Sequence, residues 1–121
     1  MKRILLFVCI QFFLLASFAG ETINFCKSWK FHLGDAGKGA SSSSYNDSQW
    51  RILNIPHDWS IEGTYKQFEN GTDWQSGFLP AGISWYRKTF TIPSKWKNKK
   101  VHFLFEGVFL ISEVCINGHW L

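Results

Sequence analysis

The chain has 121 residues, of which 45% are hydrophobic and 18% aromatic, and its formal net charge at pH 7 is +4. This length limits it to one small domain. Without Lys2 and Arg3, 11 basic residues face 9 acidic ones, so the charge balance does not favour a nucleic-acid partner. The lysines of residues 95–100 favour a solvated turn between two strands over a nucleic-acid patch.

Residues 1–19 have the pattern of a secretory signal peptide. Two basic residues precede an apolar run over residues 4–15, and small residues lead to a cleavage site after Ala19. The run is too short for a membrane span; the alternative is a retained N-terminal anchor. The pattern predicts an exported protein, periplasmic or extracellular, with its domain over residues 20–121 and no membrane partner.

Apolar and polar residues then alternate with the period of two that is typical of β-strands. The expected strands, separated by turns, cover residues 25–33, 51–55, 83–92, 101–106 and 113–116. Between the second and third of them, residues 60–82 are rich in glycine and predict a long irregular excursion. Excursions of this length in a compact domain are usually functional or bound to a partner.

The last expected strand ends at Asn117 and Gly118, and Asn-Gly is the strongest short hairpin signal because both residues tolerate positive φ. There is no internal repeat and no convincing long helix. Several short strands punctuated by Gly and Pro predict an all-β fold, an antiparallel β-sandwich.

Cysteines and histidines predict neither a disulfide framework nor a metal site. Cys26 and Cys115 each lie in a strand-like segment, and an exported protein permits a disulfide between them. Two cysteines alone make no framework, so two buried thiols are the expected state. The four histidines are scattered along the chain, and we expect no metal and no cofactor.

Four motifs follow one another in a specific order. Residues 55–59 read Ile-Pro-His-Asp-Trp, residues 82–90 read Gly-Ile-Ser-Trp-Tyr-Arg-Lys-Thr-Phe, residues 105–108 read Phe-Glu-Gly-Val, and residues 116–120 read Ile-Asn-Gly-His-Trp. In this order and spacing they resemble the N-terminal domain of glycoside hydrolase family 2, the β-galactosidase and β-glucuronidase group. The resemblance covers the whole mature chain. The chain resembles the β-galactosidase-like enzymes of polysaccharide-degrading bacteria more closely than it resembles β-glucuronidases.

The resemblance implies a jelly-roll β-sandwich, of which this chain supplies too few strands. We therefore expect an incomplete sandwich with unpaired edges and uncovered aromatic surface. It also implies that the chain is an N-terminal sugar-binding fragment of an exported, retaining β-galactosidase-like enzyme. In the full-length protein this domain would pack on a catalytic barrel, and the enzyme would hydrolyse O-glycosyl bonds of β-galactoside-type carbohydrates.

The alternatives are a free-standing carbohydrate-binding sandwich and a purely structural or interaction domain. A catalytic region further along the full-length protein would distinguish the first reading from both alternatives.

We expect no catalytic residue in this chain. Retaining glycosidases need two carboxyl groups about 5 Å apart, and no pair of acids here has supporting donors. His57 and Asp58 are adjacent, so on an extended strand they point to opposite faces. We expect Asp58 to tie the following loop and His57 to fill a hydrogen-bonded position. For Arg87 we expect stacking on tryptophan and pairing with a local acid.

Two residues are candidates for substrate binding. In the β-galactosidases that this chain resembles, the asparagine of the matching Asn-Gly tip contacts substrate at the rim of the catalytic pocket. The resemblance therefore implies that Asn117 binds a galactosyl-type ring; the alternative is an ordinary turn former. Trp74 lies in the glycine-rich excursion and is a candidate for stacking on a pyranose ring; the alternative is a core tryptophan.

Overall fold

The structure is a computed structural model that describes residues 20–66, 77–108 and 111–121. The predicted signal peptide and Trp74 lie outside the described residues. In the described part of the chain the regular elements are short antiparallel strands and 3-10 turns, without an α-helix, which confirms the all-β prediction. Those residues contain no helix of the length and apolar character that crossing a membrane requires.

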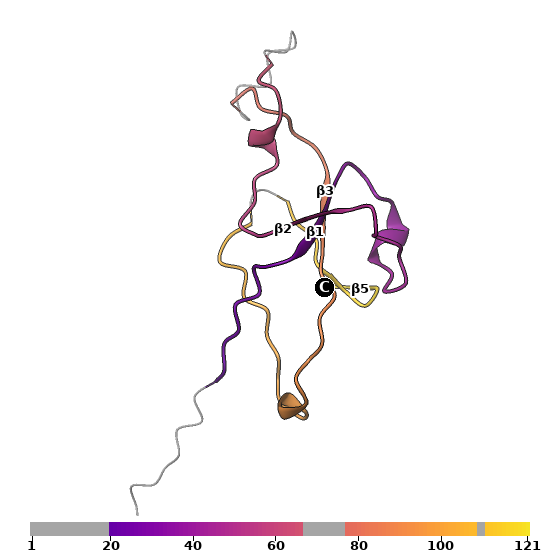
Figure 1. The fold of residues 1–121 in the computed structure, drawn as a ribbon, viewed down its shortest axis with the longest axis vertical. Coiled ribbons are helices and arrows are strands. Elements are labelled where there is room, and N and C mark those ends of the chain that lie inside the picture. The colour runs from indigo at the N-terminus through magenta and orange to yellow at the C-terminus, as the bar shows by residue number, and fades with distance from the viewer. Residues whose placement is uncertain (1–19, 67–76, 109–110) are drawn as a thin grey trace, which may run out of the picture.

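Three strands form the central sheet in the order β2-β1-β3, and both neighbours of β1 are antiparallel to it (Figure 1). β1 covers Trp29–Leu33, β2 covers Arg51–Leu53 and β3 covers Ser84–Arg87. The alternating residues of β1 suit this central position, because each face of the middle strand packs against side chains from both neighbours.

The register places a different set of side chains on each face of the sheet. Phe31 lies opposite Arg51 of β2 and Tyr86 of β3. Lys30 lies opposite Arg87 of β3. Successive side chains of a strand point to opposite sides, so we call the two sides of the sheet the Phe31 face and the Lys30 face.

A second, two-stranded sheet near the C-terminus consists of β4 (Cys115–Ile116) and β5 (His119–Trp120). The two residues between these strands have positive φ, 51° at Asn117 and 84° at Gly118. A type I′ turn requires that geometry at both positions. The hairpin predicted from the Asn-Gly pair is therefore confirmed.

The hairpin lies against the Lys30 face. The ring of Trp120 meets that of Trp85, a β3 residue opposite His32, at 6.3 Å between centroids. The thiol of Cys115 lies 3.9 Å from the carbonyl oxygen of Ser41. Cys115 and Cys26 are both free and half-buried, so the two described cysteines do not form a disulfide.

The expectation of strands over residues 83–92 and 101–106 is largely wrong. Only Ser84–Arg87 of the first segment is a strand, and the second contains none. The chain instead runs to a 3-10 turn, η5 (Ser94–Trp96), and returns along an extended path (Figure 1). Phe103 packs edge-on against Phe90, 5.5 Å away. Residues 101–106 are therefore held by packing between aromatic rings and do not form a strand.

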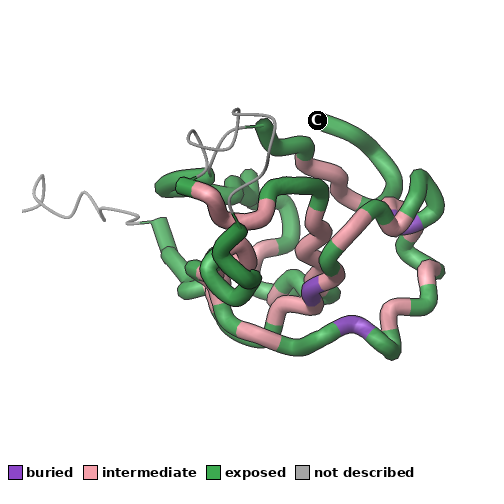
Figure 2. The backbone as a smooth tube through the Cα atoms, turned by 90° about the horizontal axis from the view of Figure 1, so that it is seen from above, coloured by how far each residue is buried: buried purple, intermediate pink, exposed green. Residues whose placement is uncertain are grey.

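Little apolar surface is enclosed. Among the described residues the buried apolar side chains are Phe31, Ala40 and Trp50. Most of the backbone in Figure 2 is coloured as exposed or intermediate. Large apolar residues are nearly bare, with Leu104 84% and Ile111 93% exposed. The expected uncovered aromatic surface is present as well, with Phe105 50% and Trp120 49% exposed. Surface of this kind marks contacts with other protein segments or ligands.

Candidate functional site

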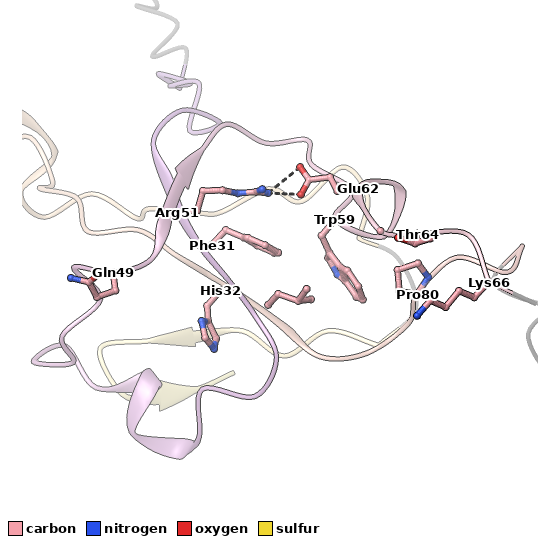
Figure 3. Close-up of a pocket in the computed structure, with 11 residues that line it drawn as sticks. Phe31, His32, Gln49, Arg51, Trp59, Glu62, Thr64, Lys66 and Pro80 are labelled. Atoms are coloured by element: carbon pink, nitrogen blue, oxygen red, sulfur yellow. Dashed lines mark hydrogen bonds and ion pairs between the residues drawn. The ribbon is translucent and has the colours of Figure 1, made fainter. Parts of the chain in front are cut away.

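An ion pair dominates the Phe31 face. Both carboxylate oxygens of Glu62, in the 3-10 turn η3 (Ser60–Glu62), accept hydrogen bonds from Nη2 of Arg51, at 3.0 and 2.8 Å (Figure 3). The Arg51 guanidinium also lies over the Phe31 ring, 5.0 Å from its centroid. The guanidinium of Arg51, and next to it the ring of His57, lower the pKa of Glu62, so Glu62 is ionised at neutral pH.

His57 connects this pair to the sheet. Its Nε2 lies 2.8 Å from Nη2 of Arg51 and 3.1 Å from Oε1 of Glu62, and its Nδ1 lies 2.8 Å from the hydroxyl of Tyr86. The Tyr86 hydroxyl donates to the backbone carbonyl of His57 at 3.3 Å, and burial raises the pKa of Tyr86. His57 therefore fills a hydrogen-bonded structural position, as predicted.

Asp58 also takes the structural role that the sequence predicts. Its Oδ1 accepts a hydrogen bond from the backbone N–H of Ser60 at 3.0 Å. The side chain thus ties the chain as it enters η3, in the manner of an Asx turn.

A cleft of about 610 Å³ opens beside the ion pair. Its lining includes Phe31 of β1, the Arg51–Glu62 pair, Trp59 and Pro80. In Figure 3 the Trp59 indole stands between Phe31 and Pro80 and points into the cleft. The volume lies within the range of ordinary ligand sites, about 300–1,000 Å³.

The described ends of the excursion over residues 60–82 meet beside this cleft. The backbone N–H of Lys66 donates to the carbonyl of Phe78 at 3.1 Å, and the Tyr65 and Phe78 rings lie 5.5 Å apart. Closer to the cleft, a Cβ on Gly63 would lie only 2.2 Å from Cγ of Pro80. Glycine is thus needed at position 63 for the two arms to approach.

Trp74 belongs to the part of the excursion that lies outside the described residues. Its contact with carbohydrate stays a prediction.

The Lys30 face has its own charge cluster, centred on Asp47. The Asp47 carboxylate bonds Lys30 through Oδ1 and Nε of Arg87 through Oδ2, the latter at 2.9 Å. The hydrogen bond from Lys30, assisted by that from Arg87, lowers the pKa of Asp47. Pairing of Arg87 with a local acid was predicted correctly.

The ring that Arg87 covers was predicted wrongly. Its guanidinium lies over Tyr45, 5.6 Å from the ring centroid, and not over a tryptophan. Its Nη1 also donates to the carbonyls of Ala40 and Ser42, at 2.7 and 2.8 Å. These bonds hold residues 40–45 against the sheet. The Tyr45 ring therefore lies close to the guanidinium of Arg87.

Asn117 lies exposed at the tip of the β4–β5 hairpin. The positive φ of Asn117 is a sufficient backbone reason for asparagine at this position. Contact with a sugar remains a prediction for this residue.

The sequence offered no sign of the Arg51–Glu62 pair. The two residues are 11 positions apart, on a strand and in a loop turn. Position 51 could have been noticed as a charged residue at the start of an apolar strand. Glu62 could not have been identified as its partner, because the fold of the loop decides which acidic side chain reaches Arg51.

The chain is similar in sequence to proteins named as glycosidases. It is 45% identical over 98 residues, 81% of its length, to a Bacteroides ovatus protein named β-galactosidase BoGH2A, of which it covers 11%. It is 36% identical over 97 residues, 80% of its length, to a Formosa agariphila protein named β-glucuronidase, of which it covers 10%. No model of a protein family matches it.

One solved structure has a much higher sequence identity to this chain than these two relatives have. The crystal structure of a β-glycosidase from Bacteroides vulgatus is 94% identical, with a TM-score of 0.79, over 84% of this chain and 13% of that one. The chain is therefore homologous to a segment of β-galactosidase-like glycosidases, as its motifs predict. It spans about a tenth of the length of the curated relatives it matches.

Proposed function

We propose that this chain is part of the N-terminal sugar-binding domain of an exported β-galactosidase-like exo-glycosidase of glycoside hydrolase family 2. The near-identity to a segment of the Bacteroides vulgatus β-glycosidase carries the proposal. The fold we propose for the whole domain is a jelly-roll β-sandwich. The antiparallel strands support it, and so do exposed apolar residues such as Leu104 and Ile111, which further strands would cover.

The role of the domain is to pack against the catalytic barrel and to contribute to the pocket for a β-galactoside-type ring. Asn117 supplies an amide to that pocket from the hairpin tip, and Trp74 is a second contact. Catalysis itself comes from residues outside this chain. The described ion pairs support this division, because Asp47 and Glu62 are both bound to cations within the domain.

The proposal includes export. Residues 1–19 direct the chain across the inner membrane, and cleavage after Ala19 leaves Gly20 as the first residue of the mature protein. N-terminal sequencing of the secreted or periplasmic product checks this directly. A product that keeps Met1 would show a retained anchor or a cytoplasmic protein.

A chimeric enzyme tests the proposed function. In it, residues 20–121 of this chain replace the matching segment of the Bacteroides vulgatus β-glycosidase. We expect the chimera to release nitrophenol from nitrophenyl β-glycosides at the rate of its parent, and a deletion of the same segment to abolish release. The 121-residue chain alone should release none. A folded but inactive chimera, or hydrolysis by the chain alone, would contradict the proposal.

A further inference from the structure

We propose that the cleft on the Phe31 face binds one neutral pyranose ring of a carbohydrate, with Trp59 as its stacking surface and the Arg51–Glu62 pair as its polar contact. This site is separate from Asn117. The hairpin that carries Asn117 packs on the opposite, Lys30 face through Trp120 and Trp85.

The apolar side of the cleft suits the face of a sugar ring. The indole of Trp59 points into the cleft, with Phe31 on one side and Pro80 on the other (Figure 3). Flat aromatic rings offer apolar area together with a negative π-face, to which the C–H groups of a pyranose are attracted. The Trp59 ring also packs against the backbone at Gly82, where a Cβ would lie 3.9 Å from Cη2.

The polar side of the cleft is held in place before any ligand arrives. Glu62 is fixed by two hydrogen bonds from Arg51, and Nε2 of His57 lies 2.8 Å from Nη2 of Arg51 and 3.1 Å from Oε1 of Glu62. His57 is anchored to the sheet through Tyr86. Pre-organised groups of this kind lower the entropic cost of binding.

The same pair keeps bonding capacity for a ligand. The side chains of Arg51 and Glu62 are 50% and 46% exposed. Among the described residues the side-chain contacts of Arg51 use Nη2 alone, and a guanidinium has five N–H donors. A carboxylate accepts about four bonds. Two neighbouring sugar hydroxyls can therefore donate to Glu62 and accept from Arg51 at once.

The charge of the pair favours a neutral ligand. An anion would be repelled by the ionised Glu62, and a cation by Arg51, because the two groups are held within 3.0 Å of each other. Sugar hydroxyls, which both donate and accept, suffer neither repulsion. The choice of a β-galactoside as the probe rests on the proposed function, whereas the shape and polarity of the cleft do not.

Titration of the full chain with methyl β-galactoside, followed by two-dimensional NMR, tests the site. The chain alone carries no catalytic pocket in our proposal, so its binding is independent of hydrolysis by the chimera. We expect a saturable shift of the Trp59 indole N–H with a millimolar Kd. Glu62→Gln should weaken binding about tenfold, because a charge-assisted hydrogen bond becomes a neutral one. Trp59→Ala, followed at the backbone N–H of Gly63, which also lines the cleft, should abolish saturation.

Glu21 provides a matched control. It is as exposed as Glu62, at 46%, and it also pairs with a cation, through Oε1 to Lys95 at 2.7 Å. Glu21→Gln should leave the Kd unchanged. Three results would each overturn the proposal: no saturable shift up to about 50 mM sugar, the same Kd for Glu62→Gln as for wild type, or equal weakening by Glu21→Gln and Glu62→Gln.

Discussion

Lys30 and Arg87 lie directly opposite each other on β1 and β3, with both side chains on one face of the sheet. Two like charges at such a cross-strand pair destabilise a sheet. Asp47 removes the conflict by binding Lys30 with one oxygen and Arg87 with the other. The Asp47 and Arg87 side chains are each only 16% exposed, so solvent screens this cluster weakly.

We predict that Asp47→Asn lowers the free energy of unfolding by about 1–3 kcal/mol, because it leaves two cations facing each other without an anion. Urea unfolding followed by circular dichroism measures the loss. The matched control is Asp35→Asn at a loop acid whose Oδ1 accepts the Gly37 N–H at 2.8 Å. That change should stay within about 0.5 kcal/mol. Equal effects at both positions would show that Asp47 is an ordinary turn residue.

The same cluster predicts a pH dependence. The pKa of Asp47 is lowered from its ordinary value of 3.8 by Lys30 and Arg87. A group with a lowered folded-state pKa stabilises the fold above its unfolded value, and this stabilisation is lost as pH falls through the folded value. The stability difference between wild type and Asp47→Asn should therefore be constant near neutral pH and shrink below pH 3.8. A difference that does not change in acid would contradict this.

Gly63 offers a steric test of the cleft. A methyl group there would lie 2.2 Å from Cγ and 2.8 Å from Cδ of Pro80. We expect Gly63→Ala to lower stability by about 1–3 kcal/mol through this overlap. Gly39→Ala is the control, because a Cβ at Gly39 meets nothing within 4 Å. If both variants are as stable as wild type, the two arms of the excursion do not meet as described.

Two substitutions at Asn117 separate its turn role from a sugar contact. With φ at 51°, Asn117→Ala should cost about 1 kcal/mol of stability, whereas Asn117→Gly keeps the turn. Both remove the amide. If it bonds a sugar hydroxyl equally in the ground and transition states, both variants of the chimera should raise KM about fivefold with kcat unchanged. An unchanged KM in Asn117→Gly would make Asn117 a turn former only.

The local signals in the sequence predicted the local structure well. Asn117 and Gly118 predicted a hairpin because positive φ depends on the two residues themselves. The alternation within residues 25–33 predicted a strand there, of which the structure contains the second part, β1 over Trp29–Leu33. The order of four motifs predicted the relationship to β-galactosidase-like glycosidases, which the comparisons confirm.

Features that depend on distant residues could not be predicted in this way. Residues 101–106 alternate as a strand does, yet a strand also needs a neighbour to complete its ladder, which alternation does not reveal. The Arg51–Glu62 pair and the Asp47 bridge depend on how two loops fold over the sheet. Their partners are 11 and 40 positions apart, so no spacing rule joins them.

The most direct test of the central claim, that this chain is part of a β-galactosidase-like enzyme, is the selectivity of the chimera. The measurement is kcat/KM for nitrophenyl β-galactoside against kcat/KM for nitrophenyl β-glucuronide, since relatives of both names match the chain. We predict a preference for the galactoside of at least about 100-fold, because the proposed catalytic pocket for a neutral galactosyl ring, to which Asn117 contributes, leaves the glucuronide carboxylate unpaired. A preference for the glucuronide, or hydrolysis of neither, would contradict the account.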